Sequence, residues 1–390
     1  MHKINIEQTA ATKGPIRVLH VLGRLNRGGT ETMIMNIYRK IDRSKIQFDF
    51  IVHTDDKCDY DDEIQELGGK IYSFPTYSGK NHFSYKYFWE TFLKRHSEYS
   101  IIHGHMRSTA AIYLKIAKKF GLITIAHSHS TSSGNGFSAI VKNIFQYPIR
   151  YIADYLFACS ENAGVWLFGA NACKKENFFI INNAIDAKKF IYDRKTDLKL
   201  RRELGIEGKF VIGHVGRFAT PKNHEFLIEI FNSVHEKVEN AILLLVGDGE
   251  LRKSIEKKVI DLELQDNVIF TGKQSEIHKL LHTMDIFVFP SLYEGLGLVV
   301  IEAQASGLRC IVSDQIPKEA FITDLVDVIS LKEKKDSWVK IIVNNATSDN
   351  KNDRKNTYEQ IKSSGYDINK TTKWLQNFYL EAFNNSCREI

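Results

Sequence analysis

Short apolar runs that alternate with longer amphipathic segments constrain the fold of this chain most strongly. In the first half, apolar runs that fit strands occupy residues 16–23, 48–54, 101–105, 122–129, 155–160 and 178–182. Stretches in which apolar residues recur with a helical period lie between them, at 30–42, 84–97, 108–120 and 138–153. Apolar strands separated by helices are typical of a parallel sheet covered on both faces. The first half is therefore predicted to be an α/β domain.

The same alternation begins again after a polar, charged stretch at 186–203. The expected strands of the second half are 210–216, 241–247, 267–272, 285–290 and 308–314, and the expected helices are 223–238, 249–263, 275–283 and 297–306. With 390 residues the chain is long enough for two domains that each bury a core. We expect two doubly wound, Rossmann-like domains, 1–190 and 191–365, that bind ligand in the cleft between them, at the carboxyl ends of their strands.

The last segment, 366–390, is expected to be a separate helix. It contains the helical pattern TTKWLQNFYLEAF, and we interpret its aromatic stripe of Trp374, Phe378 and Phe383 as a packing surface.

The positive charge is concentrated in the first half of the chain. The formal net charge is +8 for residues 1–190 and −2 for residues 191–390. Residues 80–150 hold ten basic side chains and two acidic ones, with aromatic residues such as Phe83, Tyr87 and Phe88 among them. Such a face suits an anionic membrane surface, although a merely solvated face is an equal alternative. Nucleic acid is not expected, because no recognition motif accompanies the charge.

The sequence lacks features of a secreted or membrane-spanning protein. The N-terminus has no signal-like apolar core, and no run of about 18 apolar residues occurs. The five cysteines are scattered without a CxxC pair, which is typical of reduced thiols. We expect a cytoplasmic protein, and the sequence does not indicate its oligomeric state.

The stretch PSLYEGLGLVVIEAQASG (290–307) is the strongest candidate for a ligand site. Pro290 ends an expected strand, Glu294 and Gly295 lie in the turn, and a helix is predicted to begin near Gly297. Peptide N–H groups at a helix start favour an anion, and glycines let a ligand approach the backbone. A phosphate would bind there, with the amides of Leu298 and Val299 as donors.

Glu294 and Glu302 flank this helix start. At 1.5 Å rise per residue their carboxylates are expected roughly 8–12 Å apart, which exceeds the separation of about 5 Å in a retaining glycoside hydrolase. The spacing favours one acid on a sugar and the other on a ribose, with a diphosphate between them. The alternative is two solvent-facing glutamates, although the apolar neighbours leave little polar face.

Cations and glycines for a diphosphate occur at other strand ends. Arg217 and Lys222 follow the strand at 210–216, and Asn223 is expected to cap the next helix. Gly247 lies in VGDGELR, another turn from strand to helix. Near the N-terminus, Gly28 and Gly29 precede Thr30 or Glu31 at the first helix entry, where a tight loop without a ligand is the alternative.

Histidines also gather at strand ends, as His103 and His105 in IIHGHM and as His127 and His129 in IAHSHS. An H-x-H pair on a strand directs both rings to one face, which suits a metal. We expect instead that one ring reaches the cleft and hydrogen-bonds substrate, because no Asp, Glu or Cys stands at ligand spacing. The D-x-D in DDKCDYDDE (55–63) is interpreted as a solvated loop, and no metal is assigned.

Taken together, these motifs resemble the retaining glycosyltransferases of family 4, which have the GT-B fold. Glu294 and Glu302 match the E-x7-E motif, and RGGTE, ACSEN, INNAID, GRF…PKNH and VGDGELR occur in the expected order. The segment GGTETMIMNIYRKIDRSKIQFDFIVHT is similar to the exopolysaccharide and capsule branch. The usual N-G-[IV]-D appears as Asn183-Ala184-Ile185-Asp186, without the glycine.

The resemblance implies a nucleotide-sugar donor, which the family branch suggests is a UDP-sugar, and a polyprenyl-diphosphate-linked saccharide acceptor, with no cofactor or metal required. It implies that Arg217 and Lys222 neutralise the diphosphate, that Glu294 holds the sugar and Glu302 the ribose, and that His127 lies by the donor sugar. Gly28 and Gly29 would approach the phosphate, and the last helix would cross back onto the N-terminal domain.

Two other functions fit the same residues. A nucleotide-sugar 2-epimerase of the same fold would work without an acceptor. A non-catalytic scaffold subunit that binds nucleotide is expected to have lost Arg217, Lys222 or Glu294, and this chain keeps all three.

Overall fold

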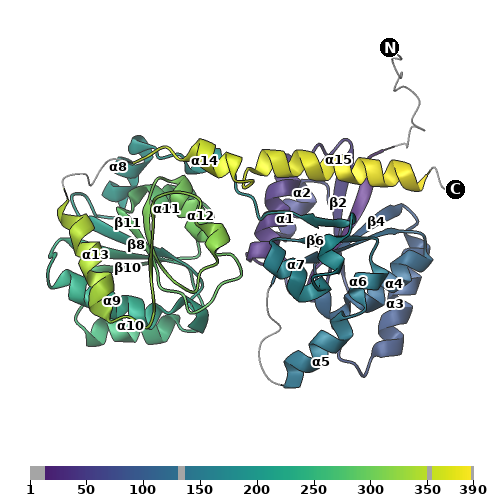
Figure 1. Cartoon of the computed structure of the whole chain (residues 1–390), viewed down its shortest axis with the longest axis horizontal. Coiled ribbons are helices and arrows are strands. Elements are labelled where there is room, and N and C mark those ends of the chain that lie inside the picture. Colours follow the sequence, from purple (N-terminus) through teal and green to yellow (C-terminus); the bar gives the residue numbers. More distant parts are fainter. Residues whose placement is uncertain (1–13, 131–136, 349–353, 388–390) are drawn as a thin grey trace, which may run out of the picture. The chain divides into compact units, whose positions relative to one another are not determined.

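The structure is a computed structural model that describes residues 14–130, 137–348 and 354–387 (Figure 1). The chain forms two compact units. Unit 1 comprises the residues up to Ala184 together with those from Ile368 onward, and unit 2 comprises Ile185–Asp367. The first boundary lies a few residues before the expected position near 190, and the second lies next to the expected start of the C-terminal segment.

Unit 1 contains a parallel sheet of seven strands in the order β3-β2-β1-β4-β5-β6-β7. Its strands are β1 (Ile16–Val21), β2 (Ile46–Val52), β3 (Ile71–Ser73), β4 (Tyr99–Gly104), β5 (Ile123–Ser128), β6 (Tyr155–Ala158) and β7 (Phe178–Ile180). Its helices are α1 (Gly29–Lys40), α2 (Asp61–Glu66), α3 (His82–Arg95), α4 (Ala110–Lys119), α5 (Phe137–Gln146), α6 (Ile149–Ile152), α7 (Glu161–Phe168) and α15 (Ile368–Ser386).

Helices cover both faces of this sheet, as the apolar strands require. Met33 of α1 and Leu375 of α15 belong to the core on one face, whereas Trp89 of α3 and Tyr113 of α4 belong to the core on the other. The C-terminal helix therefore packs on unit 1, as expected (Figure 1). The interpretation of Trp374 and Phe378 as packing residues is confirmed, since both rings lie within 6 Å of the Phe157 ring.

Unit 2 contains a parallel sheet of six strands in the order β10-β9-β8-β11-β12-β13. Its strands are β8 (Phe210–Val215), β9 (Ala241–Val246), β10 (Val268–Gly272), β11 (Ile286–Phe289), β12 (Arg309–Ser313) and β13 (Val326–Ile329). Its helices are α8 (Arg194–Glu203), α9 (His224–His235), α10 (Arg252–Asp261), α11 (Ile277–Thr283), α12 (Leu298–Ala305), α13 (Lys335–Thr347) and α14 (Tyr358–Ser363). Both sheets have the strand order of doubly wound folds, and the predicted fold class is confirmed.

Two local expectations were wrong. The polar, charged stretch at 186–203, for which no helix was expected, contains α8, which begins where Asp193 accepts hydrogen bonds from the amides of Lys195 and Thr196. The helix expected at 138–153 is two helices, because Pro148 cannot continue α5 and instead precedes α6. No helix in the described ranges is long and apolar enough to cross a bilayer.

Candidate functional site

The candidate site of unit 2 lies where the strand order of its sheet reverses. β9 and β10 lie on one side of β8, and β11, β12 and β13 lie on the other. In doubly wound folds ligands bind at this switch point, because the loops that follow the two central strands diverge there. The loops here are residues 216–223 after β8 and 290–297 after β11. They carry four of the predicted site residues, Arg217, Lys222, Glu294 and Gly295.

Lys222 and Glu294, 72 residues apart in the chain, form an ion pair across these two loops. The Lys222 Nζ donates to Oε1 of Glu294. It also lies 4.7 Å from the ring centre of Phe289, the last residue of β11. The two side chains keep 20% and 13% of their surface exposed. A ligand anion can therefore reach the ammonium, while the aromatic ring and the carboxylate hold it in place.

Asn223 joins the same two loops through its side chain. Its Nδ2 donates to the carbonyl of Pro290 at 3.1 Å, and the Leu292 amide donates to the carbonyl of Pro221 at 2.8 Å. The backbone of Asn223 is left-handed, with φ at 54°. The expected role of Asn223 as a side-chain cap of α9 was wrong: it stands at the cap position, but among the described residues its side chain accepts no hydrogen bond from the first turn.

The helix α12 starts where the sequence places it, directly after Gly297. Gly297 is the N-cap residue with φ at 79°, a conformation that favours glycine. No described side chain caps this end, so the first-turn amides, among them those of Leu298 and Val299, are available to an anion. The Glu294 side chain borders this start, since its Cγ lies 4.0 Å from where a Cβ on Gly297 would be. Gly295 is exposed in the turn between them.

Glu302 lies on the second turn of α12 without a counter-charge. Its side chain is half-buried, and within the described ranges it has no hydrogen bond or ion pair. Burial raises the pKa of its carboxyl group to about 8. A desolvated carboxyl group of this kind is suited to hydrogen-bond hydroxyl groups of a ligand.

The glycines around β8 and β9 permit close packing of backbone on backbone. A Cβ on Gly247 would lie 2.1 Å from the carbonyl oxygen of Gly216, and one on Gly249 would lie 2.5 Å from the carbonyl oxygen of Phe218. The close approach that Gly247 permits in this structure is therefore to Gly216. Its predicted contact with a ligand stays a prediction.

Arg217 does not join the Lys222–Glu294 pair. Its guanidinium donates to Glu250 at 3.0 Å, and 73% of its side chain is exposed. An exposed pair of this kind contributes little to stability, so Arg217 can turn to a ligand at small cost.

In unit 1 the predicted glycines lie at the start of α1. Gly28 is the N-cap residue, and both Gly28 and Gly29 are exposed. A Cβ on Gly28 would lie 2.5 Å from Oε2 of Glu31, whereas a Cβ on Gly29 would meet no described atom within 4 Å. Burial raises the pKa of Glu31. A carboxyl group of the protein thus lies over the turn where a phosphate contact is predicted.

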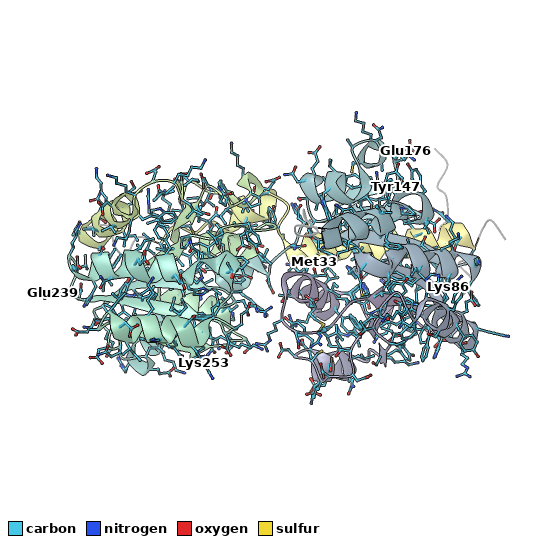
Figure 2. All side chains as sticks on the ribbon, turned by 90° about the horizontal axis from the view of Figure 1, so that it is seen from below. Met33, Lys86, Tyr147, Glu176, Glu239 and Lys253 are labelled. Atoms are coloured by element: carbon cyan, nitrogen blue, oxygen red, sulfur yellow. The ribbon has the colours of Figure 1, made fainter. Side chains whose placement is uncertain are left out.

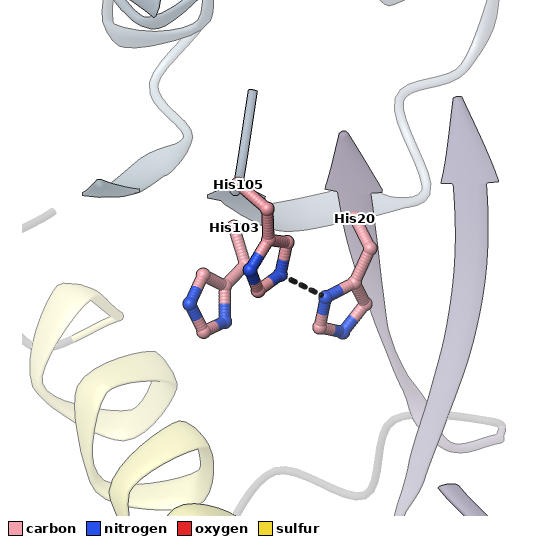
Figure 3. Close-up of side chains that lie close together, drawn as sticks. All are labelled: His20, His103 and His105. Carbon is pink, nitrogen blue, oxygen red and sulfur yellow. Dashed lines mark hydrogen bonds between the residues drawn. The ribbon is translucent and has the colours of Figure 1, made fainter. Parts of the chain in front are cut away.

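His127 belongs to a cluster of five histidines at the carboxyl ends of β1, β4 and β5, the other four being His20, His103, His105 and His129. Figure 3 shows three of these rings, with the hydrogen bond of 3.0 Å between His20 Nδ1 and His105 Nε2. His127 Nδ1 lies 3.1 Å from His103 Nε2, while its Nε2 is buried without a partner among the described residues. Only His103, His105, His127 and His129 were recognised from the sequence; His20 was missed, although it also lies near a strand end.

The remaining sequence features have local roles. In the D-x-D segment, Asp61 accepts from the Cys58 amide and Asp59 accepts from the Arg27 amide, so both carboxylates are already engaged. The cysteines in the described ranges are free thiols.

Gln304, a buried residue of α12, was not predicted from the sequence. The available signal was a polar residue within an otherwise apolar helix.

Two Rossmann-like units, with a C-terminal helix that returns to the first, define a GT-B protein. The chain matches the family model of Glycosyltransferase Family 4 over residues 27–189 and that of Glycosyl transferases group 1 over residues 197–366. A relative described as "Putative glycosyltransferase EpsF", from Bacillus subtilis, is 37% identical over 369 residues, which cover 93% of this chain and 96% of the relative. The chain belongs to the family 4 glycosyltransferases.

Two further similarities are informative. An Escherichia coli relative described as UDP-Gal:alpha-D-GlcNAc-diphosphoundecaprenol alpha-1,3-galactosyltransferase is 28% identical over 235 residues, 57% of this chain and 59% of the relative. The crystal structure of HepE from Anabaena in complex with UDP has a TM-score of 0.77 at 18% identity, and the match covers 94% of this chain and all of that one. At this identity the likeness to HepE concerns the fold.

Proposed function

We propose that this glycosyltransferase moves a sugar from a UDP-sugar to a polyprenyl-diphosphate-linked saccharide, with retention at the anomeric carbon, in exopolysaccharide or capsule synthesis. The donor diphosphate binds at the start of α12. The single observation that carries this proposal is the Lys222–Glu294 ion pair, which lies at the switch point of unit 2 beside a helix end that no described side chain caps. The name of the Escherichia coli relative supports the choice of donor and acceptor class.

Each residue of the unit 2 site then has a chemical role. Lys222, Arg217 and the amides of Leu298 and Val299 neutralise the diphosphate as it leaves. Glu294 holds sugar hydroxyl groups and Glu302 holds those of the ribose. Because the ammonium, the guanidinium and the helix start supply the positive charge, the proposed transfer does not use a metal ion. In unit 1, the donor contacts of Gly28, Gly29 and His127 stay a prediction.

The proposed reaction is a displacement on one face of the sugar. The acceptor oxygen forms a bond to the anomeric carbon, the bond from that carbon to the diphosphate oxygen breaks, and the acceptor proton passes to the leaving diphosphate. No protein side chain is needed as a nucleophile. Catalysis depends on stabilising negative charge on the diphosphate, which is the contribution that preorganised donors make most strongly.

We further propose that unit 1 docks the enzyme on the inner face of the plasma membrane. Large apolar side chains are exposed on α3 and on the α5–α6 segment, namely Phe83, Tyr87, Phe88, Ile144, Phe145, Tyr147 and Tyr151. Lys86 and Tyr147 are labelled in Figure 2. Beside α3, a pocket of about 480 Å³ is lined by Phe88, Phe92 and Arg95 among others. Aromatic side chains beside basic ones are typical of interfacial binding.

Turnover of variants tests the proposed site. Lys222→Ala and Glu294→Ala are each expected to lower sugar transfer more than about 100-fold, since the first removes a charge-stabilising donor and the second removes the carboxylate that holds that donor and the sugar in place. The assay measures UDP release and lipid-linked product with a panel of UDP-sugars. Lys258→Ala is the matched control, because Lys258 also pairs with a glutamate of unit 2, Glu229, outside the site.

Near-normal transfer by both site variants would contradict the proposed site. Conversion of a UDP-sugar into its C2 epimer without acceptor would instead favour the epimerase, and binding of UDP with no conversion by any donor and acceptor pair would favour the scaffold.

A further inference from the structure

Five buried or half-buried imidazoles meet at the carboxyl edge of the unit 1 sheet. His20 lies on β1 and His103 on β4, directly opposite one another in the ladder, and His105 follows β4 by one residue. His127 and His129 occupy the equivalent places on β5. β1 and β4 are the central strands at which the order of this sheet reverses. The cluster therefore occupies the ligand-binding edge of unit 1.

Hydrogen bonds arrange the five rings in two rows. In one row, His105 contacts His20 through Nε2 at 3.0 Å and His129 through Nδ1 at 2.8 Å. In the other, His103 contacts His127 through Nε2 at 3.1 Å and the hydroxyl of Tyr379, from α15, through Nδ1 at 2.7 Å. Burial lowers the pKa of all five rings, that of His20 to about 3. The rings are thus neutral at pH 7, and each keeps one lone pair.

The rows leave buried nitrogens without partners. A neutral ring that hydrogen-bonds through both nitrogens must donate with one and accept with the other. The N–H groups of each row therefore all donate toward the same end of the row. Whichever direction holds, the nitrogens at the row ends are not satisfied: His20 Nε2, His127 Nε2 and His129 Nδ1 are buried and have no partner among the described residues. An unpaired buried polar group is costly, which indicates that packing alone does not explain the cluster.

We propose that His20, His103 and His105 bind one late first-row transition-metal ion of the zinc class. One nitrogen from each of these three rings lies within 4.8 Å of the others, and Figure 3 shows the rings converging from two adjacent strands. Three imidazoles are a frequent ligand set for zinc, with a fourth position left open. The inference is independent of the proposed sugar transfer, which does not use this ion.

The histidine rows would become this metal site through changes of tautomer and of hydrogen-bond partner. His105 keeps its Nδ1–H on His129 and turns its Nε2 lone pair to the ion. His20 moves its proton from Nδ1 to Nε2, so that Nδ1 can bind the ion. His103 contributes one ring nitrogen in place of its bond to Tyr379 or to His127, and no proton is released. Nitrogens that share a tetrahedral zinc lie about 3.3 Å apart, since each Zn–N bond is roughly 2.0 Å. The 3.0 Å between His20 and His105 is close to this value. The bond from His105 to His129 would orient that ligand.

A second group, His105, His127 and His129, also has nitrogens within 4.8 Å. The Arg107 guanidinium, however, lies close enough to His129 to lower its pKa by repulsion. A metal cation in that group would meet the same repulsion. The pKa of His20 is lowered by burial alone, and that of His103 by burial and then by His20 and His129, which are neutral at pH 7. Charge therefore favours the group His20, His103 and His105.

Metal titration of the full chain tests the assignment. Wild-type protein is expected to bind one equivalent of Zn²⁺ at pH 7.5, to raise its unfolding temperature with added Zn²⁺, and to show the visible bands of four-coordinate Co²⁺. His20→Asn and His105→Asn are expected to lose the stoichiometric ion. His129→Asn, which removes only an orienting partner, should weaken binding by about 10-fold. His96→Asn is the matched control, because His96 lies in unit 1 outside the cluster.

The variants also distinguish the possible outcomes. His20 is fully buried, so circular dichroism must show that His20→Asn is folded; His105→Asn is a second variant at a half-buried position. Wild-type protein that binds no more Zn²⁺ or Co²⁺ than folded His20→Asn and His105→Asn would overturn the proposal. Loss of the ion in His129→Asn with retention in His20→Asn would overturn it in favour of the second group.

Discussion

Glu302 differs from the other acidic residues of the unit 2 site because nothing described neutralises it. Glu294 pairs with Lys222 and Glu250 pairs with Arg217, whereas the carboxyl group of Glu302 is half-buried without a partner in the described ranges. Its pKa is raised to about 8 by burial. The folded protein therefore holds this proton more tightly than the unfolded chain does, which makes stability depend on pH.

Glu302→Gln is predicted to remove this dependence. Below the ordinary pKa of a glutamate, near 4.5, Glu302 is protonated in both the folded and the unfolded chain. Its ionisation then does not lower the free energy of unfolding. As the pH rises toward 8, the unfolded chain loses the proton first, and wild type should lose about 1.4 kcal/mol of stability per pH unit relative to the variant. Urea unfolding of both proteins between pH 5 and pH 9 measures the difference. Parallel pH profiles would show that Glu302 does not titrate in this way.

The sequence predicts single residues of the site better than it predicts their partners. The acids, the lysine and the start of α12 follow from local signals: a strand end, glycines and a helical period. The pairing of Lys222 with Glu294 depends on β8 and β11 being neighbours. The same neighbourhood lets the Asn223 side chain bond to the Pro290 carbonyl instead of capping α9. His20 was missed because its partners His103 and His105 come from a strand about 85 residues away.

At the scale of elements, the Gln304 side chain adds a set of buried hydrogen bonds to the apolar packing of α12. Gln304 donates to the carbonyls of Val300 and Ala320 at 3.0 and 2.6 Å. Its Oε1 accepts from the amides of Ile322 and Thr323, each at 2.9 Å. These bonds fix the helix against the segment that follows β12, and so fix the helix start that the proposed diphosphate site uses.

Gln304→Leu is predicted to destabilise unit 2 by about 3–5 kcal/mol, because it leaves several buried backbone groups without partners. Gln315→Leu is the control, since the exposed Gln315 side chain bonds to no described residue other than Asp314, and it should change stability by less than about 0.5 kcal/mol. Chemical denaturation measures both. A Gln304 variant as stable as the control would mean that other contacts hold α12.

Elements were predictable where the apolar pattern was long, and not where it was short. The central strands of both sheets and the helices beside them were expected close to their observed bounds. β3 and β13 were not expected, because β3 (IYS) has only two apolar residues in a row and β13 (VDVI) contains a charge. β7, with three residues, was expected because its apolar run continues to Ile181. The helix α8 was missed because the stretch is so strongly charged that only Asp197 among its residues is buried, and it packs on α11.

For the whole molecule, the uneven charge predicts different behaviour of the two halves toward lipid. The first half of the chain has a formal net charge of +8. It also contains the exposed aromatic side chains of α3 and of the α5–α6 segment in unit 1. Wild type is predicted to bind anionic vesicles more strongly than neutral ones, with binding that weakens as salt rises. Sedimentation with phosphatidylglycerol and phosphatidylcholine vesicles measures this.

Phe83→Ser with Tyr87→Ser should reduce that binding, because both side chains are strongly exposed on α3. Ile260→Ser is the control, since Ile260 is exposed to 63% on α10 of unit 2. Equal partition onto both kinds of vesicle, or equal losses in the variant and the control, would argue against unit 1 as the docking surface.

Calorimetric titration of the full chain with UDP, and with GDP in parallel, tests the central claim most directly. If Lys222 and the start of α12 bind the diphosphate of the donor, wild type should bind one nucleoside diphosphate, Lys222→Ala should bind it about 10-fold to 100-fold more weakly, and Lys258→Ala should match wild type. Binding of either nucleotide that is equally tight in wild type and Lys222→Ala would contradict the claim.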